Sequence, residues 1–282
     1  MELFTFQDVP AFSAAVAPFL ARHEAENNLM LGIIDFGIKN PAAAADWEMA
    51  AVMDGGEPVL AALRTPPQNL IVAGEGAEAD ALALLAAHYA GKPLPGVIGP
   101  SALAQAFAAR YAGENGFKWK VTMAETVYRL TAAADVPQPG TLRPAGERDR
   151  FFLAYWLRAS DEEIFHREAA LDFERAAERM AAGDLYLYEV DGMPVCMAGT
   201  SRQMPHGRSI GPVYTPPIFR RKGYATAAAA ALSQVILERG NEYAALFADA
   251  SNPASNRAYQ KAGFVAVDEV AEIGFLPGTD EV

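Results

Sequence analysis

The chain has 282 residues, of which 51% are hydrophobic, and its formal net charge is -12 at pH 7. This length and apolar content can bury the cores of two ordinary domains. The negative charge argues against a nucleic-acid binder or a protein of anionic membrane surfaces, because both need a broad basic surface. Cys196 is the single cysteine, which excludes an intramolecular disulfide and a cysteine-based zinc cluster. With no leader-like start and no apolar run of about 18 residues, we expect a soluble cytoplasmic protein.

In the first half, strand-like and helix-like runs alternate. WEMAAVMDGGEPVLAAL, residues 47–63, predicts a hairpin around an Asp-Gly turn, and NLIVAG, residues 69–74, predicts the next strand. EGAEADALALLAAHYAG, residues 75–91, predicts a helix whose start contains Glu75, Glu78 and Asp80 and no arginine. A strand-like run then begins near Phe117 and ends at Leu130.

The segment AAADVPQPGTLRPA, residues 132–145, predicts a domain boundary because alanine, proline and glycine interrupt two apolar segments there. We expect one domain over residues 1–134 and a second over 135–282. In the second we expect a short strand at 141–143, helices from 147 to about 182, a hairpin over 185–200 and a strand over 208–215. A helix from Gly223 to about Glu238, a strand over 243–250, a short helix over 253–263 and terminal strands follow. The fold class is mixed α/β, of the α+β kind.

The two halves follow a similar plan. The hairpin LYLYEVDGMPVCMAGT, residues 185–200, repeats the Asp-Gly turn and the Pro-Val return strand of the first hairpin, so that Asp54 and Asp191 stand at corresponding turns. This likeness favours an internal structural repeat, although hairpins of this kind also recur by chance in α/β proteins. The basic loop of the second half has an acidic counterpart in the first.

That basic loop is FRRKGYATAAAAAL, residues 219–232, which lies between a strand and a helix. The amide N–H groups at the start of a helix have no partner within it, and the helix dipole favours an anion there. Gly223 and Ala225 keep side chains small where a ligand would meet the backbone. The pattern indicates a pyrophosphate site, against the alternative of a solvated basic turn before a packing helix. Neither GxxxxGK[ST] nor a GxGxxG after a strand is present.

A second polar segment follows in SNPASNRAYQKAGF, residues 251–264. Asn256 and Tyr259 are three residues apart, and so share one face of a short helix that begins near Asn252. Two amides and a phenol beside the basic loop favour a ligand site. Taken singly, Asn252 could be a helix cap and Tyr259 an ordinary half-buried tyrosine.

A strand, RxxGxA, a helix, a strand and NxxSNxxYxKxGF together resemble the GNAT-type N-acetyltransferase superfamily, most specifically over residues 209–264. The resemblance implies acetyl-CoA as acetyl donor and a primary amine of a small-molecule or peptide acceptor. It implies that the cofactor is bound by Val213, Tyr214, Thr215, Arg220, Arg221, Lys222, Gly223, Tyr224 and Ala225, with Asn252 or Asn256 at its pantetheine arm. Tyr259 matches the general acid that protonates the leaving thiolate. Ala225 replaces the second glycine of the commonest pattern, a frequent variant.

The first half looks like the divergent N-terminal copy of two-copy members, which implies two tandem GNAT-like mixed-sheet domains with the first degenerate. Its acidic loop would repel CoA phosphates, and we assign it no cofactor. Two other functions stay open: a non-catalytic sensor or interaction module that binds CoA or acyl-CoA, and an unrelated nucleotide-binding protein. A homodimer is compatible with the sequence.

A general base is not identified by the pattern. Glu162 and Glu163 lie in ASDEEIFHRE, where the acceptor would lie in such folds, but ASDEE also reads as a helix start capped by Ser160. Asp249 ends a strand and could be a turn residue. The four histidines show no metal-ligand spacing, so we expect no metal site.

Overall fold

The structure is a computed structural model that describes residues 1–76 and 79–277, so Glu78 lies outside the described residues. The chain forms two compact units. Unit 1 contains residues 1–127 and, after a long gap in sequence, the segment that begins at Asp268. Unit 2 contains residues 128–267.

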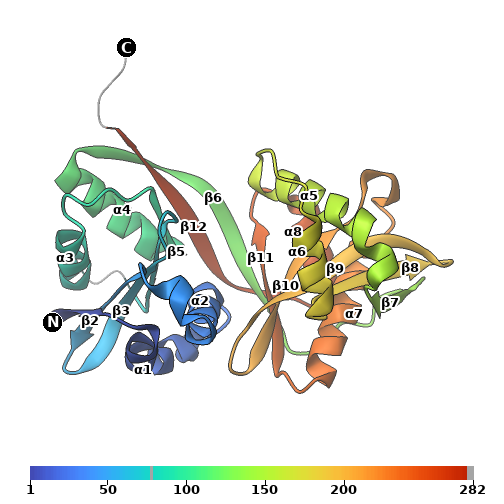
Figure 1. The fold of residues 1–282 in the computed structure, drawn as a ribbon, viewed down its shortest axis with the longest axis horizontal. Helices are drawn as coiled ribbons and strands as arrows, with labels where there is room; N and C mark the ends of the chain where they lie inside the picture. The colour runs from blue at the N-terminus through green and yellow to red at the C-terminus, as the bar shows by residue number, and fades with distance from the viewer. Residues whose placement is uncertain (77–78, 278–282) are drawn as a thin grey trace, which may run out of the picture. The chain divides into compact units, whose positions relative to one another are not determined.

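Unit 1 is a mixed sheet with a pair of helices on each face. In chain order its elements are β1 (Glu2–Phe6), α1 (Val9–Leu20), α2 (Asn28–Lys39), β2 (Glu48–Asp54), β3 (Glu57–Arg64), β4 (Leu70–Gly74), α3 (Ala79–His88), β5 (Gly96–Pro100), α4 (Ser101–Asn115) and most of β6 (Phe117–Leu130). Helices α1 and α2 pack together on one face, and α3 and α4 on the other (Figure 1). The expected hairpin is β2 and β3, which pair antiparallel.

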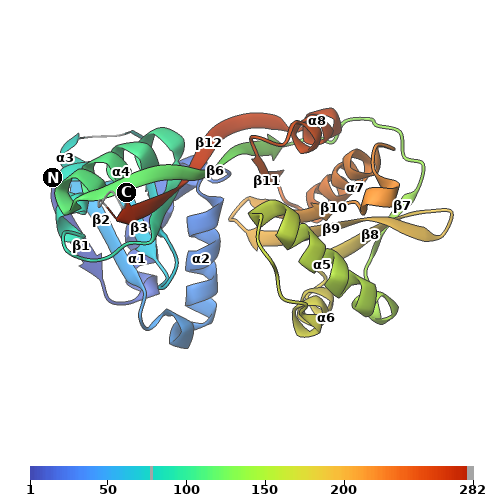
Figure 2. The same ribbon diagram turned by 90° about the horizontal axis from the view of Figure 1, so that it is seen from above.

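Unit 2 repeats this order of elements. It contains β7 (Thr141–Pro144), α5 (Arg150–Phe165), α6 (Phe173–Ala181), β8 (Leu185–Val190), β9 (Met193–Gln203), β10 (Gly207–Tyr214), α7 (Tyr224–Glu238), β11 (Tyr243–Asp249), α8 (Pro253–Ala262) and the start of β12 (Val265–Pro277). Helices α5 and α6 cover one face of the sheet, and α7 and α8 the other (Figure 2). The internal repeat expected from the two hairpins is confirmed.

The last two strands of each sheet come from the same two segments. In unit 1 the strand order is β1-β2-β3-β4-β5-β12-β6, and in unit 2 it is β12-β6-β11-β10-β9-β8-β7. Strand β12 thus lies between β5 and β6 in unit 1, whereas β6 lies between β11 and β12 in unit 2. Each of these two long strands is an internal strand in one unit and the edge strand in the other.

Because of this exchange, the boundaries of the two compact units differ from the expected division after residue 134. Val270–Gly274 of β12 pair antiparallel with β5, and Ala271 and Ile273 are buried in the core of unit 1. Tyr128 and Leu130, at the end of β6, are buried in the core of unit 2. The expected terminal strands form one continuous strand, β12, whose first residues, to Val267, belong to unit 2 and whose later residues, from Asp268, belong to unit 1.

The alanine run of α7 determines how closely this helix approaches its sheet. Ala227, Ala228, Ala229 and Ala230 are all buried, together with Leu232 and Ile236. Small side chains allow the helix backbone to pack near the strands, and α7 contacts β8, β9, β10 and β11. The close packing fixes the direction in which the amide groups at the start of α7 point.

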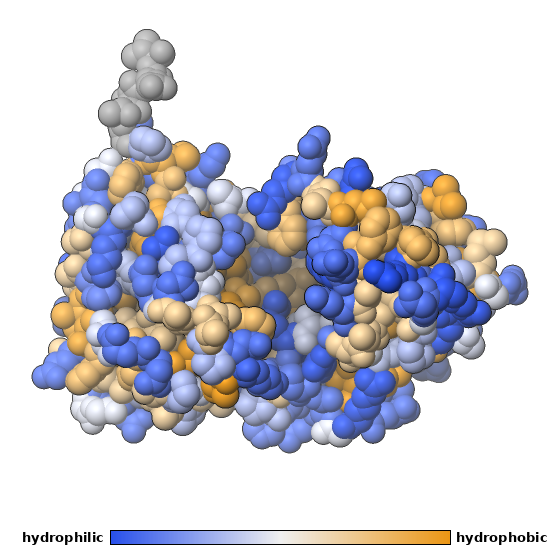
Figure 3. Space-filling view, in the orientation of Figure 1, coloured by the Kyte–Doolittle hydropathy of each residue, from blue (hydrophilic) through white to orange (hydrophobic). Residues whose placement is uncertain are grey.

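One expected helix boundary is wrong. Ser160 does not cap a helix: it is buried inside α5, which continues to Phe165. Burial of Leu153, Ala154, Leu157 and Ser160 along one face outweighs the local capping pattern. Over this helix Figure 3 shows apolar side chains at the surface, where Phe151, Ile164 and Phe165 are exposed.

Candidate functional site

A groove of about 510 Å³ lies where β10 ends and α7 and α8 begin, and we call it the β10 groove. It is lined by Glu163, Val213, Tyr214, Thr215, Phe219, Arg220, Arg221, Gly223, Tyr224, Ala225, Thr226, Asn252, Ala254, Ser255, Arg257, Ala258 and Lys261. Of the expected cofactor-binding residues, the structure brings all but Lys222 and Asn256 together in this lining. Lys222 is exposed on the loop outside it.

One wall of the groove is a strand that leaves its neighbour. Strands β10 and β11 pair in parallel only through Gly207–Ser209 and Tyr243–Ala245. Beyond that point β10 shifts register against β9 between Ile210 and Val213. Val213 and Tyr214 pair with β9 and not with β11, so the side of β10 that faces away from β9 is open to a ligand at the groove.

Arg179 of α6 forms hydrogen bonds that stabilise this irregular part of β10. Its Nη2 donates hydrogen bonds to the carbonyl oxygens of Thr200 at 2.7 Å and Gly211 at 2.9 Å. Gly199 leaves room for the guanidinium, since a Cβ there would lie 2.8 Å from the same nitrogen. Burial lowers the pKa of Arg179 from its ordinary value. The Gly211 carbonyl, at the register shift, thus accepts a hydrogen bond from the partly buried guanidinium of Arg179.

The opposite wall is the turn into α7. Arg221 and Gly223 have φ values of 64° and 82°, in the left-handed region, and Gly223 is the N-cap without a side-chain bond. The first helical bond is from Ala227 N to Gly223 O at 3.0 Å. Among the described residues, no protein acceptor takes the amides from Arg221 to Thr226. A Cβ on Gly223 would meet nothing within 4 Å, so the space before these amides is open. Such a turn binds anions through its N–H groups.

Arg220 has a different role from its neighbours in the loop. Its Nη2 lies 2.6 and 2.8 Å from the two carboxylate oxygens of Glu163, and its Nε donates to Thr215 O at 2.8 Å. The guanidinium also lies 5.8 Å from the centre of the Tyr214 ring. Arg220 therefore joins the loop to α5 and β10, and its charge is already paired within the protein.

The two asparagines of the second polar segment occupy different surroundings. Asn252 lines the groove and caps α8, because its Oδ1 accepts from the amides of Ala254 and Ser255. Asn256 donates from Nδ2 to Asp249 O at 2.8 Å and to Asn252 O at 2.7 Å, and its Oδ1 accepts from the Tyr128 hydroxyl. Asn256 thus ties the start of α8 to β11 and to β6.

Tyr259 is partly buried on α8, next to the groove and not among its lining residues. Its ring lies 6.4 Å from the ring of Tyr128 and 6.0 Å from that of Phe264. Burial first, and the neighbouring thiol of Cys196 second, raise the pKa of the Tyr259 phenol well above its ordinary value. Burial also raises the pKa of the Cys196 thiol to about 12. Both groups therefore stay protonated at neutral pH.

The three carboxylates considered as bases all have partners. Glu162 accepts from Arg158 Nε at 2.9 Å, and this bond with that from the Ala169 amide holds its pKa below the ordinary value. Glu163 pairs with Arg220. Asp249 accepts from the Ser251 amide at 2.8 Å, as a turn residue does.

Sequence reasoning missed two cations of the groove, Arg257 and Lys261 on α8. Their spacing of four residues places them on the same helix face and could have revealed them. Within residues 1–76 and 79–277, no group of three His, Cys, Asp or Glu side chains could hold a metal ion. No helix in the described part of the chain is long and apolar enough to cross a membrane.

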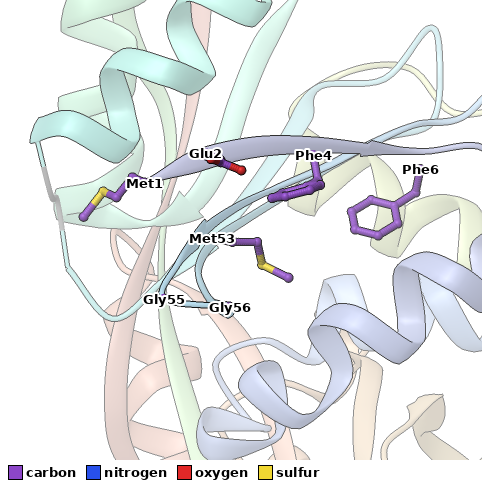
Figure 4. Close-up of a pocket in the computed structure, with 7 residues that line it drawn as sticks. All are labelled: Met1, Glu2, Phe4, Phe6, Met53, Gly55 and Gly56. Carbon is purple, nitrogen blue, oxygen red and sulfur yellow. The ribbon is translucent and has the colours of Figure 1, made fainter.

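Unit 1 has a hollow of another kind, with a volume of about 490 Å³, beside β1 and the turn between β2 and β3 (Figure 4). Its described lining is Met1, Glu2, Phe4, Phe6, Met53, Gly55 and Gly56. These residues include one carboxylate and no lysine or arginine. The hollow therefore lacks the arginine and lysine side chains and the helix-start amides of the β10 groove, and the N-terminal ammonium of Met1 at its lining lies 3.7 Å from a carboxylate oxygen of Asp54.

Comparisons with known proteins agree with this geometry. The model of the acetyltransferase (GNAT) family matches residues 149–264. A GCN5-related N-acetyltransferase from Sphaerobacter thermophilus aligns with a TM-score of 0.62 and 18% identity, covering 99% of this chain and 97% of its own. A GNAT-family acetyltransferase from Colwellia psychrerythraea aligns with a TM-score of 0.59 and 13% identity, covering 98% and 99%. No curated protein matches the chain significantly.

The two-unit arrangement also has a counterpart. A tandem GNAT protein from the clavulanic acid biosynthesis pathway aligns with a TM-score of 0.54 and 13% identity, covering 100% of this chain and 99% of its own. At this identity the likeness shows the fold, and the family-model match lies in unit 2. The chain thus has the fold of two tandem GNAT-like units, and its residues 149–264 match the model of the acetyltransferase (GNAT) family.

Proposed function

We propose that unit 2 transfers the acetyl group of acetyl-CoA to a primary amine of a small-molecule or peptide acceptor, in a ternary complex. The observation that carries the proposal is the combination of two features in one groove. The wall formed by β10 diverges from β11 after Ser209, and the turn into α7 presents amides without acceptors. The first suits an extended amide-containing arm, and the second suits a pyrophosphate.

The residues present fit this donor. The amides from Arg221 to Thr226 and the open space at Gly223 would hold the pyrophosphate, with Arg221 as a nearby cation. The backbone of Val213, Tyr214 and Thr215 would hold the pantetheine arm by strand-like hydrogen bonds. Bound acetyl-CoA supplies a thioester, whose carbonyl carbon an amine can attack.

The chain's own groups would then act on charge and protons. A backbone N–H near Val213 or Tyr214 stabilises the negative charge that develops on the carbonyl oxygen. Tyr259, whose phenol is protonated at neutral pH and whose pKa burial raises further, would donate a proton to the departing sulfur, and the proton that the attacking amine releases would restore the phenol. We assign no general base, because Glu162, Glu163 and Asp249 are already engaged.

Two measurements test the proposal. Isothermal titration should show binding of acetyl-CoA, and an assay of thiol release against a library of amines should then show transfer. Binding without transfer to any amine would favour a non-catalytic CoA-binding module. Tighter binding of ATP than of CoA would instead favour an unrelated nucleotide-binding protein.

A further inference from the structure

The β10 groove concentrates positive charge in an acidic protein. The chain has 35 acidic and 23 basic residues, yet four cations and one carboxylate line this groove. The carboxylate, Glu163, is bound to Arg220. Arg221, Arg257 and Lys261 remain, and among the described residues none of the three has a carboxylate within ion-pair distance.

Arginines elsewhere in the molecule commonly have such a partner. Those paired with a carboxylate outside the groove are Arg22, Arg64, Arg110, Arg143, Arg148, Arg150, Arg158, Arg175 and Arg208. In a chain with excess carboxylates, cations left without a partner in a concave site provide an attractive field for an anionic ligand. The lining of the groove therefore keeps a net positive charge even with Glu163 included, and it should attract an anionic ligand.

The three cations come from two different elements. Arg221 belongs to the turn before α7, where the amides without acceptors already provide a pyrophosphate cradle. Arg257 and Lys261 stand one helical turn apart on α8, beyond Asn252 and Ser255 of the same groove. A ligand held at the turn by its pyrophosphate would meet the α8 pair with a second, separate anionic group.

We propose that Arg257 and Lys261 form a subsite for the 3′-phosphate of CoA, so that the protein selects CoA thioesters that carry this phosphate. The inference rests on the proposed function. A phosphate monoester carries a charge of about -1.5 to -2 at pH 7, which one arginine and one lysine can match. Thioesters on dephospho-CoA, or on a carrier protein's phosphopantetheine, lack this group and would bind weakly.

Titration calorimetry with CoA and with 3′-dephospho-CoA tests this subsite. We expect the unmodified protein to bind CoA at least about tenfold more tightly, a difference of about 1.4 kcal/mol. Arg257→Gln and Lys261→Gln should each weaken CoA binding about threefold to tenfold and leave dephospho-CoA binding unchanged. The selectivity should disappear in the double variant. Both side chains are exposed, so thermal unfolding should not change.

Arg239→Gln is the matched control, because it removes one exposed positive charge from unit 2 at a residue that does not line the groove. It should change the affinity for the two ligands by the same small factor. Equal affinity of the unmodified protein for CoA and dephospho-CoA would overturn the subsite and leave the proposed function standing. Selectivity that persists in the double variant would also overturn it. Failure to bind either ligand would overturn both proposals.

Discussion

Gly223 illustrates how one residue can decide whether an anion binds. Its φ of 82° is costly for other residues, and the space that its missing side chain leaves is open. We expect Gly223→Glu to abolish CoA binding, because a carboxylate would lie before the amides that should receive the pyrophosphate. Arg221→Gln should only weaken binding, since it leaves those amides in place. Isothermal titration measures both.

Gly183→Glu is the control for Gly223→Glu, because it introduces the same backbone strain and the same negative charge at another site. Gly183 also has a positive φ, 72°, with nothing within 4 Å of an added Cβ, and it is not among the residues that line the β10 groove. This variant should keep its CoA affinity while losing a similar amount of stability, about 1 kcal/mol. Loss of binding in Gly183→Glu would mean that global strain, and not the groove, explains the result for Gly223.

Tyr259 provides a second test at this scale. Tyr259→Phe should lower turnover about 100-fold to 10,000-fold, because the departing sulfur loses its proton donor. The affinity for acetyl-CoA should stay nearly unchanged, because the side chain is not among those that line the groove. Steady-state kinetics and titration together separate the two effects. Unchanged turnover would remove Tyr259 from the mechanism.

The pH dependence follows from the same side chain. The pKa of the phenol is raised, so the protonated form that donates is present below that pKa and is lost as pH rises through it. Turnover should therefore persist to a pH above 10, the ordinary pKa of tyrosine. A rate profile over the range in which the protein stays folded checks this. An alkaline limb near neutral pH would assign the titrating group to another residue.

Among the elements, β10 depends most on a contact from outside its own sheet. Arg179→Met would leave the Gly211 carbonyl without its donor and should lower the free energy of unfolding by about 1–3 kcal/mol. It should also weaken acetyl-CoA binding, because Val213 and Tyr214 come two and three residues after Gly211 in the same strand. Urea denaturation and titration measure the two effects.

Arg175→Gln is the corresponding control on α6, since Arg175 pairs with Asp161 and not with β10. It should lose at most about 1 kcal/mol and keep its affinity for acetyl-CoA. Arg179→Lys should fall between the other two variants, because an ammonium keeps the charge and loses the fork of donors. Equal affinity for acetyl-CoA in all three variants would show that the Arg179 hydrogen bonds stabilise the fold without shaping the groove.

Sequence patterns were sufficient for most elements of unit 2. Apolar runs bounded by glycine and proline predicted β8, β9, β10, α7, β11 and α8 to within a few residues. Local sequence patterns did not predict the structure where contacts between residues distant in sequence determine it. ASDEE contains good capping residues, yet burial of Ser160 continues α5 through it. The different partners of Asn252 and Asn256 were also invisible, because the Tyr128 hydroxyl that binds Asn256 lies 128 residues away in sequence.

For the whole molecule, the exchange of β6 and β12 makes unit 1 depend on the far end of the described chain. Truncation after Val267 would remove β12 from between β5 and β6, together with the buried Ala271 and Ile273. Loss of one buried isoleucine alone costs about 2–5 kcal/mol. Hydrogen exchange should show lost protection in β5 and β6 while β8 and β9 stay protected.

Truncation after Pro277 keeps β12 whole and is the control for that experiment. A fragment of residues 135–282, which a boundary read from the linker would suggest, should fold poorly. It lacks the buried Tyr128 and Leu130 of the unit 2 core. A fragment that begins at Phe117 should be more stable by thermal unfolding. Equal stability of the two fragments would show that β6 contributes little to unit 2.

The place of β12 also bears on how the protein is made. A ribosome releases β5 and β6 long before it reaches Val265, so the sheet of unit 1 stays open between those strands while all of unit 2 is synthesised. At about 5–20 residues per second, that interval lasts on the order of ten seconds. During this time two strand edges are exposed to unwanted pairing. The strand that closes the first sheet comes last, and the nascent chain has to protect this gap until then.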